Sequence, residues 1–120
     1  MRLWHKDLIP KLSKKHILGQ HREACALRGK GWGRKHSTVD YVFKYPISKL
    51  FCYHEKIMEE MDKRGCKVSP EWRLAQYRGK KIGIDNSILD NWDNSDYPEH
   101  NDEYMKECIK NLKNKGFEIC

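Results

Sequence analysis

The sequence predicts a small, mainly α-helical protein: a single domain over residues 1–120 with about three main helices and long irregular connections. Three segments carry apolar residues at helical spacing, and each has a start or stop signal at its ends. The β-prone run at residues 39–43 has no second run to pair with, so no sheet is expected. A chain of 120 residues is by default one domain, burying roughly two thirds of its unfolded surface.

The first predicted helix covers residues 13–27. The serine that opens it is a suitable N-cap, and the Arg28-Gly29 pair ends it. Its apolar stripe consists of Ile17, Leu18, Ala24, Cys25 and Leu27. His16, Gln20 and Glu23 recur at spacings of four and three residues, so we expect them to share a different face.

The second predicted helix, residues 46–64, has the strongest periodicity in the chain. Its stripe follows the i, i+3, i+4, i+7 pattern and consists of Ile47, Leu50, Phe51, His54, Ile57, Met58 and Met61. Pro46 suits a first helical turn and Gly65 suits a C-terminal stop. The opposite face carries charged side chains that are expected to be solvated: Glu55, Glu59, Glu60 and Lys63.

The third predicted helix covers residues 99–115, and Gly116 closes it. Its stripe consists of Tyr104, Met105, Cys108, Ile109 and Leu112. Residues 67–98 are rich in Asn, Asp, Gly and Pro, so we expect an irregular segment with short helical turns. Residues 39–43 are expected to form an extended connector.

Charge is distributed unevenly along the chain. Residues 1–49 carry 12 Lys and Arg against three acids, a net charge of +9, and residues 50–120 carry 12 against 14, a net charge of −2. A solvated basic surface would also give such a run, but three acids in 49 residues favour a surface that faces a polyanion.

Composition indicates a folded, soluble and intracellular protein, located in the cytoplasm or nucleoid or associated with viral or nuclear DNA. Four Trp, six Tyr and three Phe argue against disorder. No apolar run approaches the roughly 20 residues that span a bilayer, and the opening MRLWHKD has no signal-peptide stretch. The five cysteines are widely spaced without a C-x-x-C pair, which indicates reduced, mostly packing thiols.

Glu23 is the residue most suggestive of chemistry. It is the one acid between Asp7 and Asp40 and lies in the most basic stretch. A surface charge is the ordinary role of a helical glutamate. However, a carboxylate beside a phosphate-binding surface repels DNA, so its presence there favours a general base or a stabiliser of a developing sugar cation. Cationic neighbours would keep it ionised.

The N-terminal amine is a second candidate. An α-amino group has a pKa of roughly 7.7–8.0, so a useful fraction is uncharged and nucleophilic at neutral pH. Amines form Schiff bases with sugar aldehydes, and this covalent route converts base excision into strand cleavage.

No metal site or cofactor is predicted. His16 and His21 are five residues apart and cannot share a helix face as an i, i+4 pair would, and no carboxylate or Cys is arranged nearby. Trp32, between two glycines, is expected to face DNA, whereas Trp4 either packs in the core or stacks on a base. The segment 29–31 (GKG) allows close approach of a phosphate but is too short for a P-loop.

Several of these segments resemble one enzyme family. Residues 16–23 (HILGQHRE), 33–36 (GRKH) and 77–79 (YRG) resemble the phage endonuclease V family of pyrimidine dimer DNA glycosylases with abasic lyase activity. Residues 1–10 (MRLWHKDLIP) and 28–33 (RGKGWG) look closer still to its cellular and viral branch. The resemblance covers residues 1 to about 80, and the last helix only by pattern.

The resemblance implies a compact α fold without a metal, in which the N-terminal amine attacks C1′ of the damaged nucleotide. On this chain Met1 would supply the amine, and Glu23 would assist expulsion of the base and the later β-elimination. Family positions and local composition together give the residues expected to contact DNA: Arg2, His16, Arg22, Arg28, Lys30, Trp32, Arg34, Lys35 and His36.

Three departures from the family pattern bear on this expectation. Phage members lose the initiator Met and expose a Thr, whereas Arg2 normally blocks removal, so Met1 itself is expected to be the nucleophile, or Arg2 if Met1 is trimmed. Ala26 replaces a basic residue that follows the glutamate by three positions, and Arg28 is the candidate substitute. The aromatic C-terminal tail of phage members is absent, so the lesion stays open between an ultraviolet dimer, an oxidised pyrimidine and an abasic site.

The leading prediction is therefore a monomeric repair enzyme that acts on double-stranded DNA carrying a damaged base or an abasic site. The main alternative is a non-catalytic basic DNA-binding module, which would bind in a salt-sensitive manner without nicking. A metal-dependent nuclease built on the histidines is a third possibility, and EDTA would abolish its activity.

Overall fold

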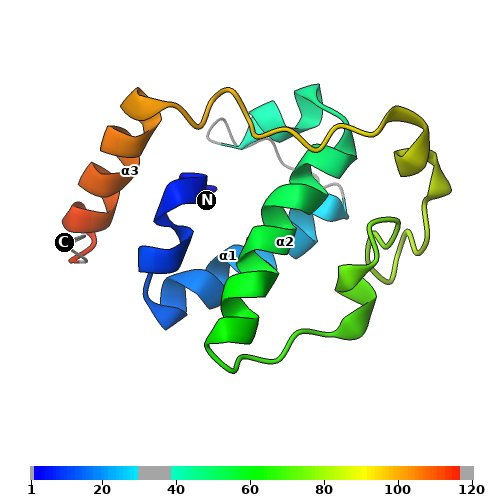
Figure 1. Cartoon of the computed structure of the whole chain (residues 1–120), viewed down its shortest axis with the longest axis horizontal. Coiled ribbons are helices and arrows are strands. Elements are labelled where there is room, and N and C mark those ends of the chain that lie inside the picture. The colour runs from blue at the N-terminus through cyan, green and yellow to red at the C-terminus, as the bar shows by residue number, and fades with distance from the viewer. Residues whose placement is uncertain (1, 30–38, 117–120) are drawn as a thin grey trace.

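The computed structural model describes residues 2–29 and 39–116. In these residues the secondary structure consists of α-helices, 3-10 helices and one isolated antiparallel bridge, Tyr77–Ile84 (Figure 1). The α-helices are α1 (Lys14–Arg28), α2 (Ile47–Lys63) and α3 (Asp102–Asn114), and the 3-10 helices are η1 (Lys6–Lys11), η2 (Asp40–Lys44), η3 (Pro70–Arg73) and η4 (Asn86–Asn91). The prediction of a mainly α fold with three main helices is confirmed.

The helix ends follow from local capping. Ser13 Oγ accepts a hydrogen bond from the backbone N–H of His16 at 3.2 Å, as the predicted N-cap of α1 should. Gly65 follows the C-cap of α2 with a φ of +74°, a left-handed conformation that glycine adopts at little cost. The third helix begins three residues later than predicted because Asn101 Oδ1 caps the N–H of Tyr104 at 2.9 Å.

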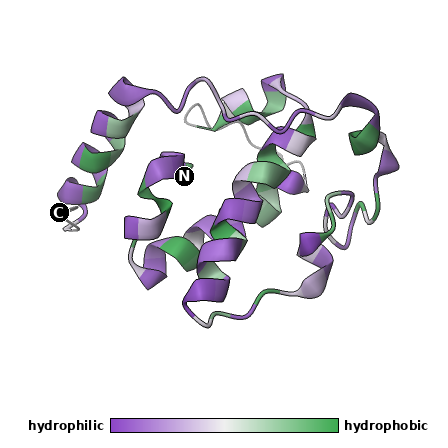
Figure 2. Cartoon of the chain, viewed as in Figure 1, coloured by the Kyte–Doolittle hydropathy of each residue, from purple (hydrophilic) through white to green (hydrophobic). Residues whose placement is uncertain are grey.

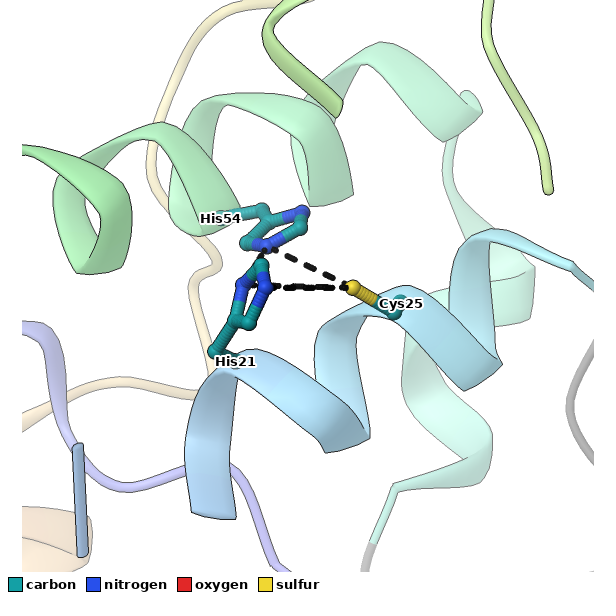
Figure 3. Close-up of side chains that lie close together, drawn as sticks. All are labelled: His21, Cys25 and His54. Atoms are coloured by element: carbon teal, nitrogen blue, oxygen red, sulfur yellow. Dashed lines mark hydrogen bonds between the residues drawn. The ribbon is translucent and has the colours of Figure 1, made fainter. Parts of the chain in front are cut away.

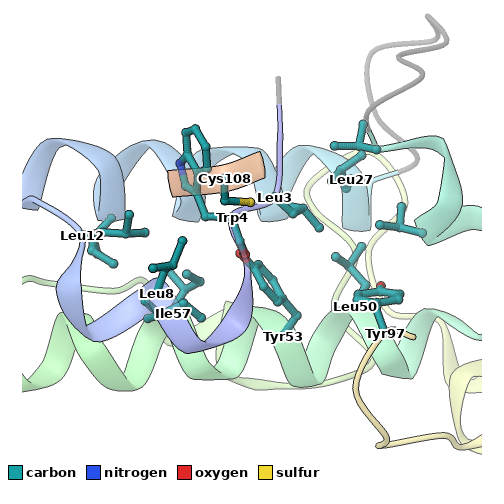
Figure 4. Close-up of a cluster of buried hydrophobic side chains, with 14 of the residues drawn as sticks. Leu3, Trp4, Leu8, Leu12, Leu27, Leu50, Tyr53, Ile57, Tyr97 and Cys108 are labelled. Atoms are coloured by element: carbon teal, nitrogen blue, oxygen red, sulfur yellow. The ribbon is translucent and has the colours of Figure 1, made fainter. Parts of the chain in front are cut away.

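The core lies between α1, α2, η1 and α3. Hydrophilic residues predominate on the outer faces of the helices (Figure 2). The N-terminal segment and η1 enter the core with Leu3, Trp4, Leu8, Ile9 and Leu12, all less than 5% exposed (Figure 4). The predicted stripe of α2 is buried except for Ile47, which is half-buried, and α3 contributes Cys108 and Leu112.

Residues 39–43 are not the extended connector that was expected. From Asp40 to Lys44 they form the 3-10 helix η2, in which Val42 N–H donates to Val39 O at 3.1 Å. Val39 and Val42 are each 1% exposed. Side chains three residues apart lie over one another in a 3-10 helix, so both valines reach the core, which alternation along a strand would not allow.

Residues 67–98 are irregular with short helical turns, as predicted. Cys25, Cys52, Cys66 and Cys108 are free thiols, as expected for that part of the chain. Over the two described ranges, no helix has both the length and the apolar character needed to cross a membrane.

Candidate active site

An open cavity of about 1000 Å³ lies between the N-terminal segment, one face of α1 and the C-terminal end of α3. We call it the N-terminal cavity; its lining residues are Arg2, Trp4, Lys15, His16, Gly19, Gln20, Arg22, Glu23, Lys115 and Gly116. Ligand pockets in proteins commonly measure roughly 300–1000 Å³, so the volume is sufficient for an unstacked nucleotide.

Helical spacing brings the predicted residues of α1 together. His16, Gln20 and Glu23 all line the N-terminal cavity, which confirms that they share a face. The Nδ1 atom of His16 lies 2.7 Å from Ser13 Oγ. Burial lowers the pKa of His16 below its ordinary value, and the positive charges of Lys115 and Lys15 lower it further, so the imidazole is neutral at pH 7.

The wall of the cavity is basic around one carboxylate. Arg2, Lys15, Arg22 and Lys115 contribute positive charge, and Glu23 is the one acid among the described lining residues. Glu23 is half-buried, and its Oε2 atom is shielded from solvent. The site therefore combines cations suited to phosphate groups with a carboxylate that has one oxygen shielded from water.

Gln20 holds the backbone of the N-terminal segment against α1. Its Nε2 donates to Arg2 O at 2.7 Å, and its Oε1 accepts from the N–H of Trp4 at 3.2 Å. The Tyr53 hydroxyl lies 2.7 Å from Trp4 O and 2.9 Å from Gln20 Oε1. Because Gln20 and Tyr53 are both buried, these bonds fix the path of residues 2–4 along the cavity wall.

The helix α3 holds the same segment from the other side. The Tyr104 hydroxyl donates to Leu3 O, and Arg2 Nη1 pairs with Glu107 Oε1 at 3.1 Å. The guanidinium of Arg2 also lies over the Tyr104 ring, 5.8 Å from its centroid. The residue that directly follows the N-terminal Met is thus held at the cavity by both α1 and α3.

Lys115 is a cavity residue that the sequence did not reveal. It lies at the C-cap of α3, and its Nζ is 5.2 Å from the centroid of the Trp4 ring, a cation–π distance. A lysine near a helix C-terminus is an ordinary surface feature, so only the fold of α3 against the N-terminal segment shows its position. Trp4 is 4% exposed, so of its two predicted roles, packing in the core and stacking on a base, the structure supports packing.

The prediction that Arg28 contacts DNA is wrong for this structure. Arg28 is 1% exposed, and its guanidinium donates to the carbonyls of Trp72, Leu74 and Tyr77 at 2.8 Å each. Burial lowers the pKa of Arg28 to about 10, which leaves it charged at neutral pH. A guanidinium enclosed by carbonyls of η3 and of the segment after it stabilises the fold and cannot also reach a phosphate.

The predicted site residues are only partly described by the structure. Arg2, His16, Arg22 and Glu23 come together at the N-terminal cavity. The remaining candidates, Met1, Lys30, Trp32, Arg34, Lys35 and His36, lie outside the described residues.

A family model described as pyrimidine dimer DNA glycosylase matches residues 1–74. The chain belongs to the pyrimidine dimer DNA glycosylase family. The matched region includes every described residue of the N-terminal cavity except Lys115 and Gly116 at the end of α3. No curated protein and no solved structure matches the chain.

Proposed function

We propose that the protein excises a damaged pyrimidine from double-stranded DNA and then cleaves the abasic site by β-elimination. Residues 1–120 act in this proposal as one monomeric domain, since α3 completes the cavity that the N-terminal segment and α1 begin. The substrate is duplex DNA from which one nucleotide is turned out of the stack so that its C1′ is exposed.

In the first step the uncharged N-terminal amine of Met1 attacks C1′ of the damaged nucleotide. The bond from C1′ to the base breaks, and the base leaves with the bonding electrons and takes up a proton. Glu23 stabilises the positive charge that develops on the sugar. Opening of the sugar ring gives a Schiff base between the N-terminal nitrogen and C1′.

In the second step a proton is removed from C2′ of the Schiff base, with Glu23 as the assisting base. The electrons form the C2′–C3′ double bond, and the C3′–O bond breaks to release the 3′ phosphate group. Water then hydrolyses the Schiff base and restores the free amine. Neutral His16 and the surrounding cations hold the DNA backbone throughout.

The chain belongs to a glycosylase family, and one observation on its structure favours this proposal over the DNA-binding module. Arg2, which directly follows the residue that carries the amine, and the half-buried Glu23 both line one basic cavity of about 1000 Å³. A surface that only bound DNA would gain nothing from a carboxylate among four cations, because the carboxylate repels phosphate.

Borohydride trapping tests the covalent step. Sodium borohydride reduces a Schiff base to a stable amine, so a protein–DNA adduct should accumulate on a duplex carrying a pyrimidine dimer or an abasic site, with or without EDTA. After digestion, the adduct should map to the N-terminal peptide, and an intact-mass measurement identifies the first residue. An adduct on a lysine such as Lys30 would refute the assignment of the amine.

The variant Glu23→Gln tests the carboxylate. Because general acid–base assistance contributes roughly 10²- to 10⁴-fold, strand cleavage should fall by about that factor while DNA binding persists. Glu59→Gln, on the exposed face of α2, is the matched control and should cleave like the wild type. Binding without cleavage by the wild type on every lesion tested would favour the DNA-binding module, and loss of cleavage with EDTA would favour a metal-dependent nuclease.

A further inference from the structure

Three potential metal ligands converge between α1 and α2, away from the N-terminal cavity (Figure 3). His21 and Cys25 lie one turn apart on α1, and His54 faces them from α2. The expectation that no Cys is arranged near His16 and His21 is therefore wrong for His21. Spacing within one helix could not reveal the cluster, because His54 lies on α2, 33 residues after His21 in the sequence.

The separations within the cluster are close to those around one metal ion. His21 Nδ1 lies 2.8 Å from His54 Nε2, and Cys25 Sγ lies 3.8 Å from His21 Nδ1 and 3.9 Å from His54 Nε2. An ion about 2.0 Å from each nitrogen and about 2.3 Å from sulfur separates its ligand atoms by roughly 3.3–3.7 Å. Small rotations of the two rings would open the short side enough to admit the ion.

We propose that His21 Nδ1, Cys25 Sγ and His54 Nε2 bind a single Cu(I) ion that links α1 to α2. One thiolate and two imidazoles are a soft ligand set, which selects thiophilic d¹⁰ ions over Mg²⁺ or Ca²⁺. All three side chains are half-buried or buried, and Cu(I) is stable with three ligands, so the site requires no bound water.

The neighbouring charge favours Cu(I) over Zn²⁺. Arg28 Nη1 lies 3.0 Å from His54 Nδ1, which brings a buried positive charge to the far side of the ring. Cu(I) with one thiolate is neutral, since one positive charge meets one negative charge. Zn²⁺ in the same site would leave one positive charge beside Arg28, and two like charges in a poorly solvated interior repel strongly.

Binding would exchange hydrogen bonds for metal–ligand bonds. Arg28 can only donate, so His54 Nδ1 accepts from it, and the ring proton lies on Nε2, which donates to His21 Nδ1. When the ion binds, this proton moves to Nδ1, so the hydrogen bond from Arg28 to Nδ1 is lost and the two donors must move apart, while Arg28 Nη1 keeps its 2.8 Å bond to Trp72 O. The Cys25 thiol loses its proton to solvent, so one proton is released per ion and copper stays Cu(I).

Anaerobic titration of the full chain with Cu(I), in competition with a chromogenic Cu(I) chelator, tests the site. Cys25→Ser removes the sulfur, and Cys52→Ser is the matched control, since Cys52 is also a half-buried free thiol. Wild type and Cys52→Ser should each bind one Cu(I) that Cys25→Ser does not. The affinity lost in Cys25→Ser should exceed the roughly 10- to 100-fold that loss of an outer-shell partner costs.

X-ray absorption of the copper-loaded protein supplies a second readout, with one sulfur and two nitrogens expected around copper. A shell of sulfurs alone, or equal Cu(I) binding by Cys25→Ser and wild type, would overturn the site. Tight binding of Zn²⁺ with no competitive Cu(I) binding would overturn the choice of ion. Circular dichroism of each variant verifies that it is folded. No measurement uses DNA, so the outcome is independent of the proposed glycosylase activity.

Discussion

At the scale of single residues, His100 shows how one buried ring links the stability of this fold to pH. His100 is 7% exposed, its Nδ1 accepts from Lys6 N–H at 3.3 Å, and its Nε2 lies 2.7 Å from the Tyr41 hydroxyl. Burial, followed by the charge of His5, lowers the pKa of His100 to about 3. The ring is therefore neutral in the folded protein, with a proton on Nε2 that it donates to Tyr41.

This depressed pKa predicts that the protein loses stability in mild acid. An unfolded histidine takes up a proton near pH 6.5, but folded His100 takes one up only near pH 3. Between these pH values the folded ring does not bind the proton that the unfolded ring binds. The contribution of neutral His100 to stability is therefore fully present above pH 6.5 and is lost as the pH falls toward 3.

The measurement is the free energy of unfolding by urea at several pH values between 7 and 4, for wild type and His100→Gln. The wild type should lose up to about 1.4 kcal/mol per pH unit more than the variant, since each unit by which a pKa differs corresponds to about that energy. Identical pH dependence in the two proteins would show that His100 is not the group responsible.

At the scale of elements, α3 holds the N-terminal segment, whose amine is the nucleophile of the proposed reaction. Its Tyr104 hydroxyl bonds to Leu3 O and its Glu107 pairs with Arg2. Tyr104→Phe removes the first bond and leaves the aromatic ring. Because a lost hydrogen bond costs about 1 kcal/mol and a small misplacement of a reacting group costs up to about 100-fold, borohydride trapping should slow by roughly 5- to 100-fold.

Binding affinity separates this positioning role from a role in holding DNA. Tyr104→Phe should bind duplex DNA with nearly the wild-type dissociation constant, so the effect appears in the single-turnover rate. Tyr45→Phe is the matched control, since the Tyr45 hydroxyl bonds to Glu99 and Tyr45 does not line the N-terminal cavity. Equal rates for Tyr104→Phe and wild type would contradict the positioning role.

The helices also show which features of the structure could be predicted from residues close together in the sequence. Caps and apolar spacing located the three α-helices to within a few residues, and spacing alone predicted the shared face of His16, Gln20 and Glu23. Arg28 could not be predicted, because its guanidinium is buried by carbonyls at least 44 residues away. The position of Lys115 at the cavity could not be predicted either, because it depends on where α3 packs.

At the scale of the whole molecule, the N-terminal cavity gathers cations from both the basic and the acidic part of the chain. The basic N-terminal part contributes Arg2, Lys15 and Arg22 to the N-terminal cavity, and α3 adds Lys115 from the part whose net charge is −2. Four cations from distant parts of the chain thus line the same cavity as Glu23. Such an arrangement should attract a DNA backbone over several phosphates.

The salt dependence of DNA binding measures this arrangement. Each side chain that neutralises a phosphate displaces counterions and adds about −0.9 to the slope of log Kobs against log salt. Lys115→Ala should therefore reduce the magnitude of the slope by about 0.9, whereas Lys63→Ala, exposed on α2 outside the cavity, should leave it unchanged. Because Lys115 lies beyond the residues that match the family, an unchanged slope for Lys115→Ala would show that α3 completes the cavity without contacting DNA.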